Sequence, residues 1–107
     1  MSLPPHVLSI VRESELQRTI EDMLDWAHLL HFHDEDARRD EAGLPDLIFP
    51  RPPVLHLWEL KTQRGQLRTE QAKWAAQLLR CTSIDYRVVR PEHLDQVREY
   101  LGFRRGG

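Results

Sequence analysis

The sequence is poor in cysteine and in long apolar runs, and both absences restrict what the protein can be. A single cysteine, Cys81, excludes an intramolecular disulfide and any zinc or iron–sulfur site made of cysteines alone. We expect Cys81 to pack in the core. No apolar run approaches the roughly 18 to 20 residues that a transmembrane helix needs, so we expect no membrane partner. No basic segment followed by an apolar stretch opens the chain, and we therefore expect a cytoplasmic protein without a cleaved secretory signal.

The composition is that of an ordinary soluble domain. Of the 107 residues, 40% are hydrophobic and 30% are charged, and a chain of this length has room for one core, so we expect a single domain over residues 1–107. The formal net charge is -2. Residues 13–41 hold ten of the seventeen acidic residues, whereas residues 42–107 hold eleven Lys and Arg against seven acids. This basic surplus suits contact with phosphate, although solvated charged faces are commoner than nucleic-acid surfaces.

Hydrophobic periodicity predicts an α/β fold. We expect a helix over residues 14–28 with a capping box at Ser14 and Gln17, a short strand over 29–33 and a loop over 34–42. A hairpin follows, with strands over 46–49 and 54–61 around a four-residue, proline-rich loop, because proline cannot supply ladder hydrogen bonds. The chain then continues as a helix over 69–80, a strand over 84–89 and a helix over 91–101. The inward stripe of the helix over 69–80 would be Trp74, Ala75, Leu78 and Leu79.

Strand, helix and strand in succession predict a parallel unit, because a crossover helix returns the chain in the same direction. The predicted architecture is therefore a mixed sheet with helices around it, in the order αβββαβα.

Three charged residues stand where a core strand should be apolar. Asp46 opens the first hairpin strand, and Glu59 and Lys61 lie near the end of the second, which is otherwise apolar. If opposed residue numbers in the hairpin sum to 103, strand alternation places all three on one face. The two carboxylates would then be diagonal neighbours, with roughly 7 to 8 Å between their backbones. A loop one residue longer or shorter would separate them.

These side chains predict metal-assisted hydrolysis. Two carboxylates about 5 Å apart repel by about 3 kcal/mol at an effective dielectric near 20, so we expect a cation between them. Magnesium binds through one or two carboxylates and keeps several waters, and a metal-bound water becomes a nucleophile for phosphodiester attack. Lys61 would stabilise charge on the phosphoryl oxygens or help to orient and deprotonate that water. The alternative is an ordinary ion pair of Glu59 with Lys61, with Asp46 as a turn residue; the shared face favours the joint site.

The chain resembles a known group of nucleases. The segments Gly43-Leu44-Pro45-Asp46 and Glu59-Leu60-Lys61 are similar to the two-part motif of the PD-(D/E)XK nuclease superfamily. Over roughly residues 13–101 the chain resembles the VRR-NUC (virus-type replication-repair nuclease) branch, which implies a restriction-endonuclease-like core. The further matches are Glu15-Leu16-Gln17, His33, Asp36, Arg38, Arg39, Gln71, Trp74 and Val88-Val89-Arg90-Pro91.

The resemblance also implies roles for individual residues. Asp46, Glu59 and the backbone carbonyl of Leu60 would bind Mg²⁺ or Mn²⁺, and Lys61 would be the catalytic lysine. Glu15 would be the first-helix acid that completes the metal site. Glu13 competes with it for this role, and an acid in the first turn of a helix is also favourable in itself.

Residues outside the motif are expected to support the site. Gln71 precedes Trp74 and Leu78 at helical spacing, so it would face the site and contribute to catalysis; the alternative is a solvated first-turn residue. His31 and His33 could share a strand face, but they lack partners at the spacing of a zinc site. The cations expected to grip the DNA backbone without sequence readout, each also explicable as a solvated charge, are Arg38, Arg39, Arg64, Arg68 and Lys73.

From this resemblance we expect a magnesium-dependent DNA endonuclease of recombination and repair, in the cytoplasm of a bacterial or phage-infected cell. Because so small a chain has a limited DNA footprint, we also expect a homodimer that cuts branched DNA such as a Holliday junction. One alternative is a catalytically silent nucleic-acid- or protein-binding module, which would not require two acids beside a lysine. A restriction-type or RNA-directed nuclease would be expected to carry target-recognition segments, for which the chain has little room.

Overall fold

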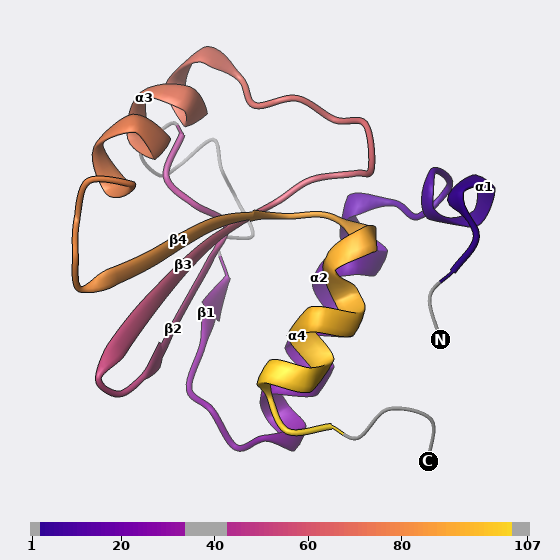
Figure 1. The fold of residues 1–107 in the computed structure, drawn as a ribbon, viewed down its shortest axis with the longest axis horizontal. Coiled ribbons are helices and arrows are strands. Elements are labelled where there is room, and N and C mark those ends of the chain that lie inside the picture. Colours follow the sequence, from indigo (N-terminus) through magenta and orange to yellow (C-terminus); the bar gives the residue numbers. More distant parts are fainter. Residues whose placement is uncertain (1–2, 34–42, 104–107) are drawn as a thin grey trace.

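The computed structural model describes residues 3–33 and 43–103 (Figure 1). The expected loop over 34–42, with Asp36, Arg38 and Arg39, lies outside these residues. The elements are α1 (Pro5–Leu8), α2 (Glu13–Trp26), β1 (Phe32–His33), β2 (Leu47–Arg51), β3 (Val54–Leu60), α3 (Thr69–Leu78), β4 (Ile84–Val89), the 3₁₀ helix η1 (Pro91–His93) and α4 (Leu94–Tyr100). The predicted order αβββαβα is confirmed, with α1 and η1 as additional short helices.

The strands form one mixed sheet, as predicted, in the order β1-β2-β3-β4. Strand β2 is antiparallel to both β1 and β3, whereas β3 and β4 are parallel. Helix α3, which joins β3 to β4, lies on one side of the sheet, whereas α2 and α4 lie side by side on the other (Figure 1). The two faces of the sheet are thus covered differently.

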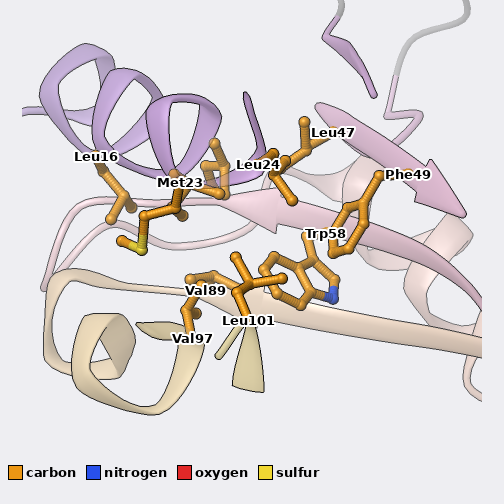
Figure 2. Packing of buried hydrophobic residues seen from close by; sticks show 11 residues of the cluster. Leu16, Met23, Leu24, Leu47, Phe49, Trp58, Val89, Val97 and Leu101 are labelled. Atoms are coloured by element: carbon orange, nitrogen blue, oxygen red, sulfur yellow. The ribbon is translucent and has the colours of Figure 1, made fainter. Parts of the chain in front are cut away.

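The hydrophobic core lies on the side of α2 and α4. Figure 2 shows side chains of β2, β3 and β4 packed between these helices. Phe49 meets Trp58 edge to face, with 4.8 Å between ring centroids. Each fully buried large apolar side chain contributes about 1.5–3 kcal/mol, so this layer is the main source of stability. It consists of Leu16, Ile20, Met23, Leu24, Leu47, Phe49, Trp58, Leu60, Val89, Val97 and Leu101.

The hairpin register differs from the prediction by two residues. Arg51 pairs with Val54 and Leu47 with Trp58, so opposed residue numbers sum to 105 and the predicted sum of 103 is wrong. The turn is only Pro52-Pro53, and Pro50 lies within β2. Strand β1 pairs only with Leu47 and Ile48, so among the described residues nothing pairs with this edge of β2 beyond Ile48, and proline is tolerated there. A shift of two residues preserves the alternation of side chains, so the predicted shared face survives the error.

The start of α2 was also predicted wrongly. The helix begins at Glu13, not at Ser14, and the expected capping box of Ser14 with Gln17 does not form. Instead, the Arg12 backbone N–H donates to the Glu15 carboxylate at 3.2 Å. The Glu15 side chain therefore caps the N-terminus of α2.

Helix α3 is shorter than predicted. It ends at Leu78, so Leu79 projects from the following turn and is 68% exposed, although it was expected to face inward. Cys81, expected in the core, is exposed for the same reason. The early strand is also shorter than the predicted 29–33, because only Phe32 and His33 pair with β2. Over the described residues, no helix combines the length and apolar character needed to cross a bilayer.

Candidate active site

Asp46 lies directly before β2, on the sheet face that α3 covers. Its carboxylate accepts a hydrogen bond of 3.0 Å from the backbone N–H of Leu60. Extended by one residue, the hairpin register places Asp46 directly opposite Glu59. Directly opposed residues on neighbouring strands point to the same side. The structure therefore brings these two acids closer together than the diagonal relation predicted from sequence.

Gly43 allows the segment that carries Asp46 to pack against α3. Its backbone has φ of +89°, a conformation that side chains disfavour. A Cβ at this position would overlap the backbone carbonyl of Glu70 in the first turn of α3. Glycine is thus required here both by conformation and by close approach, and it fixes where Asp46 enters the sheet.

Glu59 is a buried acid with one unpartnered oxygen. It is 1% exposed. Its Oε1 accepts a 3.0 Å hydrogen bond from the Gln71 side-chain amide, whereas Oε2 has no hydrogen-bond partner among the described residues. Burial contributes most to raising the pKa of Glu59 from 4.5 to about 9. Asp46 adds to the rise by accepting a hydrogen bond from the protonated form of Glu59 and through its own charge, and the charge of Lys61 opposes it. Two carboxylates in this position need a proton or a cation between them.

Lys61 and Gln71 complete the buried polar group. Lys61 follows β3 directly and is 8% exposed, and its backbone N–H donates to the Val89 carbonyl at 3.0 Å. Gln71 is 4% exposed, so it is not the solvated residue of the alternative interpretation. Its side-chain oxygen accepts the Arg68 N–H at 2.8 Å while its amide holds Glu59. Gln71 thus both caps α3 and orients Glu59.

The structure brings Glu13, not Glu15, toward this group. Burial and then the charge of Asp46 raise the pKa of Glu13, and Lys61 is among the cations that lower it, so Glu13 is within electrostatic range of both. The exposed Glu15 carboxylate instead pairs with the Arg12 side chain at 2.8 Å, and this hydrogen bond lowers its pKa. Because Glu15 is the third residue of α2, its side chain turns back to the helix start.

The predicted DNA-contacting cations fall into three groups. Arg64 and Arg68 are exposed in the loop between β3 and α3. Lys73, exposed on α3, pairs with Glu70 at 3.1 Å. Arg38 and Arg39 lie outside the described residues. Neither candidate histidine joins a zinc cluster, because no three His, Cys, Asp or Glu side chains in the described ranges are arranged to hold a metal ion.

Tyr86 is a residue of this face that sequence reasoning missed. It pairs with Leu57, two residues before Glu59, so it shares the side of the sheet on which Glu59 lies. Its buried hydroxyl has no hydrogen-bond partner among the described residues. Burial and then the charges of Glu59 and Asp46 raise its pKa to about 12. Alternation along the strand predicted over 84–89 would have found it once the parallel register was known.

A groove of about 610 Å³ lies between the ends of β3 and β4 and helix α4. Its polar groups satisfy one another: the His56 ring nitrogens bond Asp85 and Tyr100, at 2.7 Å each. It therefore lacks the unpartnered acid that distinguishes the group around Glu59.

The donor set around Glu59 fits a hard divalent cation. Carboxylate and carbonyl oxygens are the ligands that magnesium and manganese prefer, and two carboxylates suffice when waters complete the coordination. The buried, unpartnered Oε2 of Glu59 beside a second carboxylate is the observation that supports this fit.

Comparisons with known proteins agree with this geometry. The family model described as the VRR-NUC domain matches residues 2–92. A solved structure titled "VRR_NUC domain" is similar in fold, with a TM-score of 0.65 and 15% sequence identity, and the match covers 84% of this chain and 98% of that one. A comparison with curated proteins returned no match.

Proposed function

The chain belongs to the VRR-NUC domain family and is a nuclease-type domain, and we propose that it is a metal-dependent DNA endonuclease that hydrolyses phosphodiester bonds. The observation that supports this most directly is the buried Glu59 beside Asp46, whose Oε2 has no hydrogen-bond partner among the described residues. Burial of a carboxylate without a partner costs several kcal/mol unless the site binds a cation or keeps a proton.

The proposed metal site involves four residues. Three of them, Asp46, Glu59 and the backbone carbonyl of Leu60, would hold Mg²⁺ or Mn²⁺. The fourth, Glu13, takes the place of Glu15 as the first-helix acid and would act on the ion through its charge rather than as a direct ligand, because no three acidic side chains of the described residues are arranged to hold one ion. When bound, the ion supplies Lewis acidity toward the phosphoryl group and lowers the pKa of water.

The other residues act through charge and position. The charge of Lys61 acts on both Glu59 and Glu13, so Lys61 lies near the acid pair, where it would stabilise the negative charge that builds up on the phosphoryl oxygens during attack. Gln71 holds Glu59 through Oε1 and leaves Oε2 for the cation. One oxygen of the Asp46 carboxylate is held by the Leu60 N–H, which leaves the other oxygen for the cation.

The proposed substrate is branched DNA, such as a flap or a four-way junction, and the proposed working form is a homodimer. A chain of 107 residues offers a small DNA footprint, and two copies would present two sites to opposed strands. Light scattering and junction cleavage at one protein concentration test this part: a monomer that cuts junctions fully would remove the dimer.

The assay of the main proposal compares linear, flapped and four-way DNA with magnesium or with a chelator. Wild type is expected to cut only with magnesium, and Lys61→Ala and Asp46→Asn to lose about 10²-fold or more, the loss typical when a charge-stabilising group is removed. Asp22→Asn and Arg18→Ala, exposed on α2, are controls expected to cut normally. Cleavage that persists in chelator or in Asp46→Asn contradicts the proposal. Metal-independent DNA binding without cleavage would instead favour a silent binding module.

A further inference from the structure

The side chain of Arg90 holds the loop that follows Lys61 by donating hydrogen bonds to backbone carbonyls of that loop. Its guanidinium Nη1 donates to the backbone carbonyl of Thr62 at 2.8 Å, to that of Gly65 at 2.5 Å, and, at a longer 3.5 Å, to that of Gln63. A second contact ties the same loop to η1, because the Glu92 N–H donates to the Gln63 side chain at 3.1 Å. The loop over residues 61–68 is thus anchored to the end of β4 through its carbonyl groups.

This anchoring dictates where the N–H groups of the loop point. In a trans peptide the C=O and the following N–H point in opposite directions. With the carbonyls of Thr62, Gln63 and Gly65 directed at Arg90, the N–H groups of Gln63, Arg64 and Gln66 point away from it. None of these three N–H groups has a hydrogen-bond partner among the described residues.

The loop is tight, and its charge is positive. The N–H of Gly65 donates to the Thr62 carbonyl at 3.2 Å, and a Cβ at Gly65 would lie 2.7 Å from the Thr62 hydroxyl. Arg64 and Arg68 are exposed on the loop, and the charge of Arg68 acts on Glu13 beside the acid pair. In Figure 1 the loop arches outward beyond the ends of β3 and β4 before it enters α3.

From these features we propose that the loop over residues 62–67 is a phosphate-binding site, in which the backbone N–H groups of Gln63, Arg64 and Gln66 bind a phosphate of the DNA backbone. Unpaired N–H groups of one loop that point away from the protein can bind an anion together, and the Arg64 side chain adds positive charge. Arg90 is the positioning residue, because it withdraws the carbonyls that would repel the phosphate. The inference rests on the proposed function, since the loop begins at Lys61 and would hold a phosphate beside the scissile one.

Backbone donors of this kind read no sequence but fix the register of the DNA against the catalytic group. The loop would therefore set which phosphate reaches Lys61.

The test separates the loss of a backbone N–H from the loss of a side chain at the same position. Gln66→Pro deletes the N–H, and the matched Gln66→Ala keeps it. DNA affinity is measured by fluorescence anisotropy with a short labelled duplex in chelator, so that binding is separated from cleavage. Gln66→Pro and Arg90→Gln are expected to weaken binding about tenfold, the effect of one charge-assisted hydrogen bond, and Gln66→Ala, which keeps the N–H, is expected to lose clearly less than Gln66→Pro.

A second measurement needs no variant. In ¹H–¹⁵N spectra of the wild-type chain, saturating duplex should shift the amide resonances of Gln63, Arg64 and Gln66, and these amides should be protected from hydrogen exchange. Equal affinities of Gln66→Pro and Gln66→Ala, or unmoved loop amides, overturn the site even if wild type cuts DNA. Failure of wild type to cut DNA with magnesium overturns the proposed function instead. If Gln66→Pro or Arg90→Gln fails to fold, the wild-type spectra decide.

Discussion

At the scale of single residues, the site is defined by a buried acid next to a second acid, without a hydrogen-bond donor for one of its oxygens among the described residues. Glu59 is 1% exposed, its neighbour Asp46 is also acidic, and its Oε2 has no donor among the described residues. Such an arrangement lowers the stability of the free protein unless it serves binding or catalysis, because buried polar groups are otherwise almost always paired. The acid pair was predictable from sequence because two acids and a lysine interrupt apolar strands. The choice between Glu13 and Glu15 was not, because it depends on where α2 begins.

The raised pKa of Glu59 predicts that the stability of the protein depends on pH. The pKa of Glu59 is raised from 4.5 to about 9 in the fold, so between these values the unfolded chain has released a proton that the folded chain retains. The free energy of unfolding should therefore fall as pH rises from about 5 to about 9 without metal. Urea unfolding in chelator across that range measures it.

Asp46→Asn supplies the comparison for this measurement. The amide keeps an oxygen for the Leu60 N–H and offers N–H donors to Glu59, so the variant should lose the part of the pH dependence that Asp46 causes, keep the part that burial causes, and be more stable than wild type near pH 9. Asp22→Asn should behave as wild type. A pH profile that is the same in wild type and Asp46→Asn would contradict this account of Glu59.

Tyr86 gives a second prediction at this scale. Its buried hydroxyl has no partner among the described residues, so Tyr86→Phe removes an unsatisfied group and keeps the ring in place. We expect the free energy of unfolding to stay within about 0.5 kcal/mol or to rise by about 1 kcal/mol. Chemical denaturation of the metal-free protein measures this. A loss of more than about 1 kcal/mol would show that the hydroxyl is bonded in the fold.

At the scale of elements, sequence predicted the order of helices and strands better than their ends. Strand Ile84–Val89 was predicted to the residue, because β-branched and aromatic residues fill it. The hairpin register was two residues off, since nothing local shows that Pro50 is tolerated in β2; the answer depends on how far β1 extends. The site survived the error because side chains alternate with a period of two.

Gly43 packs directly against the first turn of helix α3. Gly43→Ala would drive a Cβ into the backbone of Glu70, so the segment before Asp46 or helix α3 must shift. We expect a loss of about 2 kcal/mol or more in stability together with reduced cleavage, because Asp46 and Gln71 lie on the two displaced segments.

Gly102→Ala separates crowding from backbone strain at Gly43. Gly102 also has positive φ, +96°, but a Cβ there meets nothing within 4 Å. The Gly102→Ala variant should lose about 1 kcal/mol of unfolding free energy, because of the backbone conformation alone, and should cleave DNA as wild type does. Thermal unfolding and the DNA assay on both variants measure the difference. Equal losses would mean that contact with α3 does not position Asp46.

At the scale of the whole molecule, the sheet separates stability from chemistry. One face packs against α2 and α4 and carries the core cluster (Figures 1 and 2). The other face, which α3 covers, carries Asp46, Glu59 and Lys61, and Gln71 of α3 donates a hydrogen bond to Glu59. The acids can therefore be changed without opening the core. The composition of the chain predicted one soluble domain, but only the three-dimensional arrangement shows that Arg90, at the end of β4, reaches across to the loop after Lys61.

The most direct test of the central claim is calorimetric titration of the full chain with Mn²⁺ near pH 8, in buffers of different ionisation heat. We predict that wild type binds the ion and releases a proton, because Glu59 keeps its proton in the free protein. Asp46→Asn and Glu59→Gln should bind at least about tenfold more weakly, and Asp22→Asn as wild type. Undiminished binding by Asp46→Asn and Glu59→Gln, or no binding by wild type, would contradict the claim that this acid pair holds the catalytic metal.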